Sequence, residues 1–445
     1  TPEIYTLSLH DALPISDRLL KSDKRVEFKG KIALVLSGGG ARGAYQIGVW
    51  KALKDCGVQI GGVYGTSVGA INATAIAMDR IEEARDLWLR MDFSSVVKDG
   101  SGNNLVEKIF AAMVSGGFDN TPLRECFERL LDEESVRNSG IDMGIVTYSL
   151  SGMEPRELYI EDIPQGELAD YVLASANHPV FKRAKIDDEK FIDGGVYRNI
   201  PINMALEKGF EEIVVVDLGP KRLRDVLSLA SVKRSKEVFE ILLTPEEFYG
   251  DVLDFDPELS AKYMREGYLD GLKALGFLKG SKFYIHAMQD ILGQALFSMP
   301  RPKKTEILKI FGIEKWQSES THHFYYGQLL AVLQDFFDTT SPLETVIALL
   351  ESMAEAADLP RFELYSIASM AEAISKADPG AFQDLLYNDI NGTTIAEFLS
   401  FLLENSSLDK LQGDEYLSLR KSFDGFSPAC REPLSTEEEI GRAHV

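Results

Sequence analysis

Three short motifs in this chain of 445 residues carry groups that act together in acyl transfer. Ser67 lies within the run Gly65–Gly69 (GTSVG), a glycine-rich run spans Gly38–Gly43 (GGGARG), and an aspartate opens Asp193–Gly195 (DGG). A serine hydroxyl is a nucleophile once a base accepts its proton, and backbone N–H groups stabilise the oxyanion that forms on an attacked carbonyl. The motifs therefore supply a nucleophile, a carboxylate base and an anion-binding turn.

The serine motif has the pattern of a sharp turn between a strand and a helix. In a G-x-S-x-G turn the serine Oγ is exposed at the carboxyl end of a sheet, and the flanking glycines, here Gly65 and Gly69, leave room for the crowded backbone. Val68 follows at the expected start of a helix, where a backbone N–H has no intrahelical acceptor. We therefore predict that Ser67 is the nucleophile and that the Val68 N–H helps to bind the oxyanion.

The glycine-rich run follows a short apolar segment, residues 32–36, and precedes a helical pattern that begins near Ala44. Because Gly38, Gly39 and Gly40 carry no side chains, their N–H groups are free to point at an oxyanion. A G-x-G-x-x-G turn is also typical of dinucleotide binding, which expects an acidic residue at the end of the next strand. That strand ends in Val63-Tyr64-Gly65 without a carboxylate, so the pairing with the serine turn favours an oxyanion loop, and nucleotide binding stays the alternative.

The base is expected to be Asp193, which ends a short apolar strand and is followed by Gly194 and Gly195. A free aspartate has a pKa of about 3.9, and burial in an apolar cleft would raise it toward the working range of a base. A Ser67–Asp193–His286 triad is an alternative in the chain order of many hydrolases. His178, before a proline in an expected loop, is interpreted as a structural or surface residue.

Composition excludes several classes of partner. Hydrophobic residues make up 45% of the chain, which is ordinary for a globular protein, and the formal net charge is −23. Such a charge argues against nucleic acid as a partner and against electrostatic recruitment to anionic lipid. The cysteines, Cys56, Cys126 and Cys430, are too far apart for a metal or redox motif, and no apolar run is long enough to span a bilayer.

The two ends have the pattern of translated sequencing adapters rather than natural protein. Residues 1–16 (TPEIYTLSLHDALPIS) and 439–445 (EIGRAHV) are therefore set aside from the functional reasoning. We expect a cytoplasmic protein or one peripheral to a membrane. Export stays open, because an added end would hide the natural N-terminus.

Strand and helix patterns alternate through the first part of the chain, which predicts an α/β fold with a mostly parallel sheet between helices. We assign this domain to residues 28–280 and an all-α domain of unknown role to residues 303–435, with a linker at Pro300–Lys304. Residues 92–118 are expected to form either a core helix with a loop or a lid over an acyl-binding cleft. Capping boxes are expected at Ser341–Glu344 and at Thr394–Glu397.

The glycine-rich turn, the GTSVG turn and the DGG turn, in this order, resemble the patatin-like phospholipase family over about residues 28–275. The resemblance implies a dyad without histidine, formed by Ser67 and Asp193, and an oxyanion hole that includes Gly38, Gly39 and Gly40. It also implies that Arg42 and Gly43 belong to a substrate-binding stretch, with Arg42 supporting the loop or a lipid phosphate. Where the family usually has an apolar residue before the proline, this chain has His178. A basic cluster follows at 182–185.

The implied activity is phospholipase A or lysophospholipase hydrolysis of carboxylic esters through an acyl-enzyme, without a metal or other cofactor. The implied partners are a phospholipid or other acyl-ester lipid and the surface of a membrane, with no nucleic acid; oligomeric state, headgroup and chain preference are left open. The alternatives are a non-catalytic lipid-binding protein and a nucleotide-binding α/β protein.

Overall fold

The computed structural model describes residues 25–96, 118–219, 239–287, 291–313, 321–406, 408 and 413–427. These residues divide into two compact units. The sheet unit comprises Glu27–Gly271 with the described residues 424–427, and the helical unit comprises Leu272–Phe423 with residues 25–26. Both expected adapter ends and most of the expected lid segment, 97–117, lie outside the described residues.

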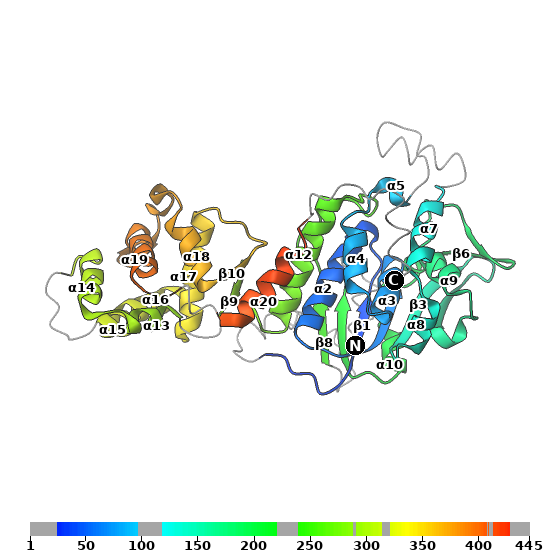
Figure 1. Ribbon diagram of the computed structural model, residues 1–445, viewed down its shortest axis with the longest axis horizontal. Helices are drawn as coiled ribbons and strands as arrows, with labels where there is room; N and C mark the ends of the chain where they lie inside the picture. Colours follow the sequence, from blue (N-terminus) through cyan, green and yellow to red (C-terminus); the bar gives the residue numbers. More distant parts are fainter. Residues whose placement is uncertain are drawn as a thin grey trace, which may run out of the picture. The chain divides into compact units, whose positions relative to one another are not determined.

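The sheet unit is built on an eight-stranded sheet of order β5-β6-β3-β2-β1-β7-β8, with β4 paired to β3 (Figure 1). Neighbours from β3 to β8 are parallel, whereas β4 and β6 run antiparallel to β3, and β5 runs antiparallel to β6. The strands are β1 (Ile32–Leu36), β2 (Ile60–Thr66), β3 (Asp142–Ser149), β4 (Glu154–Tyr159), β5 (Ala184–Ile186), β6 (Glu189–Asp193), β7 (Glu212–Val216) and β8 (Phe239–Leu243). The predicted mostly parallel sheet is confirmed.

Helices cover both faces of this sheet. All five residues of β1 are fully buried, as a central strand between two helical layers requires. Ala33 and Val35 pack with Ile202 and Met204 of α10, and Leu34 lies on the other face of the strand. The helical segments of the unit are η2 (Gly40–Gly43), α2 (Ala44–Asp55), α3 (Val68–Ala77), α4 (Ile81–Trp88), α5 (Phe93–Val96), α7 (Thr121–Leu130), α8 (Glu133–Asn138), η3 (Ile160–Asp162), α9 (Leu168–Ser175), η4 (Gly194–Val196), α10 (Ile202–Glu207) and most of α12 (Pro257–Ala274).

The helical unit has a separate hydrophobic core, whose fully buried residues include Leu350, Met353 and Leu399. Its helical segments are α13 (Ile291–Ser298), α14 (Arg301–Ile310), α15 (Thr321–Phe324), η5 (Tyr325–Leu329), α16 (Leu330–Phe337), α17 (Pro342–Ala356), α18 (Ile367–Ser375), η6 (Pro379–Phe382), α19 (Gly392–Asn405) and α20 (Gly413–Asp424). Two short pairs of strands accompany them, β9 (Tyr284–His286) with β10 (Leu364–Ser366) and β11 (Leu386–Tyr387) with β12 (Ile390–Asn391). The unit is thus largely helical, as predicted, with small strand pairs in addition.

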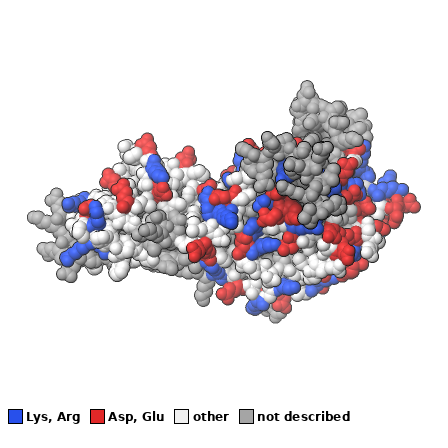
Figure 2. Space-filling model, viewed as in Figure 1, with Lys and Arg blue, Asp and Glu red and all other residues white. Residues whose placement is uncertain are grey.

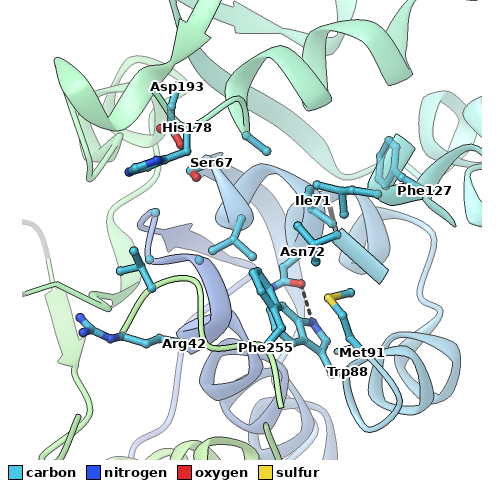
Figure 3. A pocket seen from close by; sticks show the side chains of 18 of the residues that line it. Arg42, Ser67, Ile71, Asn72, Trp88, Met91, Phe127, His178, Asp193 and Phe255 are labelled. Atoms are coloured by element: carbon cyan, nitrogen blue, oxygen red, sulfur yellow. Dashed lines mark hydrogen bonds between the residues drawn. The ribbon is translucent and has the colours of Figure 1, made fainter. Parts of the chain in front are cut away.

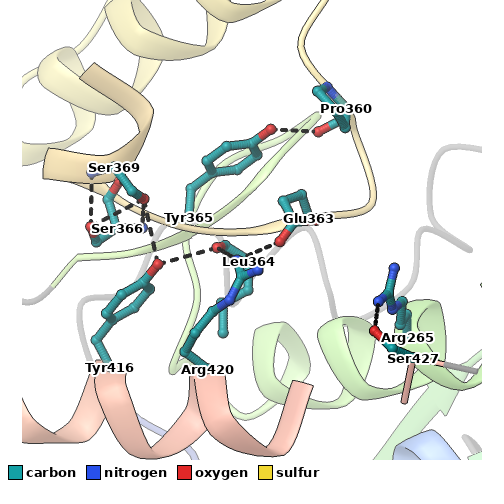
Figure 4. A network of polar contacts seen from close by, with 10 residues as sticks. All are labelled: Arg265, Pro360, Glu363, Leu364, Tyr365, Ser366, Ser369, Tyr416, Arg420 and Ser427. Carbon is teal, nitrogen blue, oxygen red and sulfur yellow. Dashed lines mark hydrogen bonds and ion pairs between the residues drawn. The ribbon is translucent and has the colours of Figure 1, made fainter. Parts of the chain in front are cut away.

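Polar contacts fix α20 against β10 in this unit (Figure 4). Arg420 forms an ion pair with Glu363 and donates to the Leu364 carbonyl at 3.0 Å, and the Tyr416 hydroxyl donates to the same carbonyl at 3.4 Å. The Ser366 side chain caps α18 by accepting from the Ser369 N–H at 3.0 Å. The helix that ends the described chain is therefore an integral part of this unit.

Candidate active site

Ser67 and Asp193 are carried by two strands that pair with the same edge of β3. β2 runs parallel to β3 and its last residue pairs with Val146, whereas β6 runs antiparallel and Asp193 pairs with Thr147, the next residue of β3. The ends of β2 and β6 therefore meet beside β3. This register brings the predicted nucleophile and the predicted base to one place, although 126 residues separate them in sequence (193 − 67).

Ser67 stands at a strained turn between β2 and α3. Its backbone has φ 57° and ψ −127°, a conformation that L-residues rarely adopt, and its side chain lies in a wall of the pocket described below. The turn is held by a hydrogen bond of 2.9 Å from the Ser67 N–H to the Ser175 hydroxyl, which in turn donates to the Val146 carbonyl at 2.6 Å. A Cβ on Gly65 would lie 2.2 Å from the Gly69 carbonyl oxygen, so this crossing requires glycine.

Asp193 is nearly buried, with 5% of its surface exposed. Its N–H donates to the Asn177 carbonyl at 3.0 Å, and its Oδ1 accepts from the Gly195 N–H at 2.7 Å, which fixes the carboxylate in the turn η4. A Cβ on Gly194 would lie 2.2 Å from the Val146 carbonyl oxygen. The DGG sequence therefore allows the carboxylate to approach β3 closely.

The glycine-rich turn presents backbone N–H groups to the same place, but Gly38 differs from Gly39 and Gly40. The Gly38 N–H donates to Asn199 Oδ1 at 3.1 Å, and Asn199 Nδ2 donates back to the Gly38 carbonyl at 3.2 Å. The N–H groups of Gly39, Gly40 and Val68 have no acceptor among the residues that the structure describes. Since all three residues line the pocket beside Ser67, their N–H groups are available to an oxyanion, whereas that of Gly38 is already used.

Arg42 supports this turn from outside. Its guanidinium donates to the carbonyls of Leu218 at 3.4 Å and Gly250 at 3.1 Å, and it stacks on Phe248 at 4.3 Å from the ring centre. The Ala41 N–H donates to the Val252 carbonyl at 2.8 Å. Figure 3 shows the Arg42 side chain directed away from Ser67. These contacts favour the first of its two predicted roles, support of the loop.

The segment at 246–252, whose Gly250 and Val252 carbonyls accept two of these bonds, is itself hydrogen-bonded to a buried carboxylate of α12. Glu266 is fully buried and accepts from the Glu246 N–H at 2.6 Å. Burial, with a smaller effect of the Asp270 charge, raises the pKa of Glu266 to about 7. A carboxyl group that titrates near neutrality therefore lies beneath the segment that holds the glycine-rich turn.

A buried polar network connects the helices behind the site. Asn72 of α3 donates to the Gly43 carbonyl at 3.0 Å and to Gln46 Oε1 at 2.8 Å, and it accepts from the Trp88 indole at 3.2 Å (Figure 3). Gln46 donates to the Ser37 carbonyl at 2.8 Å. Because every bond joins a different element, the network fixes the glycine-rich turn relative to α2, α3 and α4.

A mostly apolar cavity of about 300 Å³ opens beside Ser67. Ser67, Asp193 and His178 lie at one end in Figure 3, and Met91 and Phe127 lie at the other. The wall between them is formed by apolar side chains of α3, its C-cap residue, α4 and α7, which include Ile71, Met78, Leu87, Trp88, Leu123, Phe127 and Leu130. Such a cavity is suited to an extended hydrocarbon chain whose polar end lies at the serine.

The two histidines considered as candidates, His178 and His286, lie in different units. His178 lines the pocket, and burial lowers its pKa, so the imidazole is neutral at pH 7. His286 belongs to the helical unit, where its Nε2 lies 2.7 Å from Glu415 Oε2. The alternative triad with His286 gains no support from this contact.

Sequence reasoning missed Asn199, Ser175 and Asn72. Each is a buried polar residue next to apolar neighbours, such as Asn199 before Ile200 and Ser175 within the apolar face of α9. A polar side chain at a position that the pattern assigns to the core is the signal that could have found them.

Residues 34–206 match the model of the patatin-like phospholipase family. Patatin-like phospholipase domain-containing protein 7 of Rattus norvegicus is 25% identical over 202 residues, 44% of this chain and 14% of that protein. Patatin-like phospholipase domain-containing protein 6 of Homo sapiens is 24% identical over 269 residues, 58% of this chain and 18% of that protein. The chain therefore spans less than a fifth of the length of these curated relatives.

Among solved structures, the crystal structure of VipD from Legionella pneumophila aligns with 91% of this chain and 92% of its own at 13% identity, with a TM-score of 0.36. That score is too low to establish a shared overall fold. The family match confirms the resemblance inferred from the three motifs.

Within the described residues, no helix combines the length and the apolar character needed to cross a bilayer. The described residues also contain no group of three His, Cys, Asp or Glu side chains placed to hold a metal ion. Metal independence stays a prediction.

Proposed function

From the premise that this chain contains a domain of the patatin-like phospholipase family, we propose that it hydrolyses carboxylic esters of lipids by a Ser67–Asp193 dyad. The observation that best supports the proposal is the set of free N–H groups, those of Gly39, Gly40 and Val68, around a strained serine in an apolar pocket. Donors already fixed in place stabilise a developing oxyanion without reorganisation.

In the first half-reaction, Ser67 Oγ bonds to the ester carbonyl carbon while Asp193 accepts the hydroxyl proton. The carbonyl oxygen becomes an oxyanion and accepts hydrogen bonds from the three free N–H groups. When the intermediate collapses, the bond to the alkoxy oxygen breaks. The leaving alcohol takes the proton from Asp193, and the acyl group stays on Ser67.

In the second half-reaction, water adds to the acyl carbonyl and gives a proton to Asp193. The same N–H groups stabilise the second oxyanion. Collapse breaks the bond to Ser67 Oγ, which takes the proton back from Asp193, and the fatty acid leaves. The cycle consumes one water and needs no other reactant.

The pocket supports a lipid substrate, because an acyl chain that enters it leaves water for a surface of apolar side chains such as Ile71, Trp88 and Phe127. We further propose a phospholipase A or lysophospholipase reaction at the surface of a membrane. Arg42 and Gly43 take part by holding the glycine-rich turn, through the contacts of Arg42 to Leu218 and Gly250.

A fluorophosphonate probe tests the nucleophile. The probe is expected to label the chain at Ser67, as mapped by mass spectrometry. Ser67→Ala and Asp193→Asn should each lower ester hydrolysis by several orders of magnitude and keep the thermal unfolding temperature within a few degrees. Ser151→Ala, at an exposed position, is the matched control and should keep full activity.

Two results would overturn the proposal. Activity retained in either dyad variant would reassign the role of that residue. A chain that binds lipid vesicles without reacting with the probe would instead be a lipid-binding protein, and stabilisation by NAD or ATP without labelling would favour the nucleotide-binding alternative.

A further inference from the structure

His178 occupies a rigid turn between α9 and β5, on the pocket wall that also carries Ser67 and Asp193 (Figure 3). The His178 N–H donates to the Ala176 carbonyl at 2.9 Å, and the His178 carbonyl accepts from the Phe181 N–H at 2.8 Å. Phe118 pairs with this turn on its other side, donating to the Val180 carbonyl at 2.8 Å. The backbone that carries the imidazole is therefore fixed.

The ring has one nitrogen in use and one that is free. Nδ1 accepts from the Val180 N–H at 3.4 Å, and the ring edge faces Phe181 at 6.5 Å between centres. Because burial lowers the pKa of His178, the ring is neutral, and an accepting Nδ1 leaves the proton on Nε2. Nε2 has no acceptor among the described residues, so it is a neutral donor on the wall of the pocket.

The position of the donor determines which half of an ester it meets. Apolar side chains of α3, α4 and α7, among them Ile71, Trp88 and Phe127, line the part of the pocket that suits the acyl chain. His178 lies at the opposite end from Phe127, beside Ser67 and Asp193 (Figure 3). Val196, three residues after Asp193 in the sequence, also lines the pocket and is 52% exposed, so this end of the pocket reaches solvent. With the reacting carbonyl at Ser67, the alcohol half of the ester lies at this opening.

We propose that the His178 Nε2–H donates a hydrogen bond to an oxygen of the alcohol half, so that His178 selects esters of oxygen-rich alcohols such as glycerol and phosphoglycerol. This inference rests on the proposed function, since it assumes that Ser67 is acylated. An apolar residue at this position would leave such an oxygen without a donor. His178 thus distinguishes a glycerolipid from a simple ester with the same acyl chain.

The test compares three decanoyl esters with the same acyl chain: decanoyl lysophosphatidylcholine, monodecanoylglycerol and 4-nitrophenyl decanoate. His178→Leu should lower kcat/KM for the lysophospholipid about 10- to 100-fold, the effect of losing a hydrogen bond to a charged oxygen. The nitrophenyl ester, whose alcohol half carries neither a hydroxyl nor a phosphate oxygen and whose nitro oxygens are weak acceptors at the far side of the ring, should change less than about threefold. His178→Gln, which keeps an N–H donor, should restore part of the loss.

The glycerol ester identifies the oxygen: a loss shared by monodecanoylglycerol assigns a glycerol oxygen, and a loss confined to the lysophospholipid assigns the phosphate. Equal losses on all three esters, or no loss on any, would overturn the role of His178. A wild-type chain that hydrolyses none of the esters would overturn the proposed function itself, and a wild type that cleaves only the nitrophenyl ester would overturn the selection of oxygen-rich alcohols.

Discussion

One side chain holds the Gly38 peptide on both its donor and its acceptor side. Asn199 accepts from the Gly38 N–H and donates to the Gly38 carbonyl, and this pair of bonds holds Gly38, the residue from which the chain continues to Gly39 and Gly40. A donor displaced by a fraction of an ångström no longer meets the oxyanion. Asn199 is therefore a positioning residue for the proposed reaction.

Asn199→Ala is expected to lower kcat about 10- to 100-fold with little change in KM, because the misplaced donors matter most in the transition state. Steady-state hydrolysis of a nitrophenyl ester measures both constants. Asn138→Ala, at an exposed position on α8, is the control. A higher KM with unchanged kcat would show that Asn199 contributes to binding instead.

Glu266 couples stability to pH near neutrality. Its pKa is raised from 4.5 to about 7 in the folded chain, chiefly by burial, so the folded state holds a proton that the unfolded state releases between these pH values. The raised pKa therefore makes the fold less stable as pH rises from about 4.5 to 7, by roughly 3 kcal/mol in all. Tyr249, the N–H groups of Glu246 and Glu247, and the Asp270 carboxylate face this group.

Glu266→Gln should remove that part of the pH dependence, because an amide does not ionise. Thermal unfolding at pH 5.5 and pH 8 is expected to show a smaller difference in the variant than in the wild type. Glu258→Gln, an exposed position on the same helix, should behave like the wild type. An unchanged difference in the Glu266 variant would mean that its carboxyl ionises well below pH 5.5 in the folded chain.

At the scale of elements, local patterns predicted most strands and helices of the sheet unit to within a few residues. The apolar segment at residues 32–36 is β1, and the helical pattern expected to begin near Ala44 is α2 (Ala44–Asp55). Each depends on a run of apolar residues or on helical periodicity within its own segment. Such elements can be predicted without knowing their neighbours.

What could not be predicted depends on neighbours. β6 runs antiparallel to β3 and thereby brings Asp193 to the end of β2. This arrangement depends on pairing between segments that are distant in sequence, which local patterns do not specify. The expected linker at Pro300–Lys304 was wrong: Pro300 is the N-cap of α14 and Pro302 lies in its first turn, where proline is tolerated. The cap of α19 is Asn391 rather than the expected Thr394.

The glycine-rich turn is predicted to depend on close packing and not only on backbone freedom. Gly40 has φ +58°, and a Cβ there would lie 1.9 Å from the Val252 carbonyl oxygen. Gly57 has φ +73° with nothing within 4 Å. Both alanine variants suffer backbone strain of about 1–2 kcal/mol, but only Gly40→Ala must also displace the supporting segment.

Gly40→Ala should therefore abolish ester hydrolysis and fluorophosphonate labelling, whereas Gly57→Ala should lower the unfolding temperature by a few degrees and keep its activity. Activity and the unfolding temperature are measured on the same purified sample of each variant. Comparable activity in the two variants would show that the turn adapts to a side chain, and the assignment of Gly40 as an oxyanion donor would then fail.

At the scale of the whole molecule, the net charge would govern an encounter with the proposed lipid surface. The chain has a formal net charge of −23, and on the face shown in Figure 2 acidic and basic side chains are interspersed over the sheet unit. Repulsion from anionic lipid extends over roughly 30 Å at 10 mM salt and about 8 Å at 150 mM. Approach to an anionic membrane should therefore improve as salt is added.

Fatty-acid release from vesicles tests this expectation. With half phosphatidylglycerol, the rate should rise several-fold between 10 and 150 mM NaCl, whereas on pure phosphatidylcholine it should change less than about twofold. The zwitterionic vesicles control for direct effects of salt on the enzyme. A rate on anionic vesicles that falls with salt would instead mean that local cations dominate docking. Replacing Lys182 and Arg183 of the basic cluster at 182–185 by glutamine would then reduce that rate at low salt, because these two side chains lie next to the turn that carries His178.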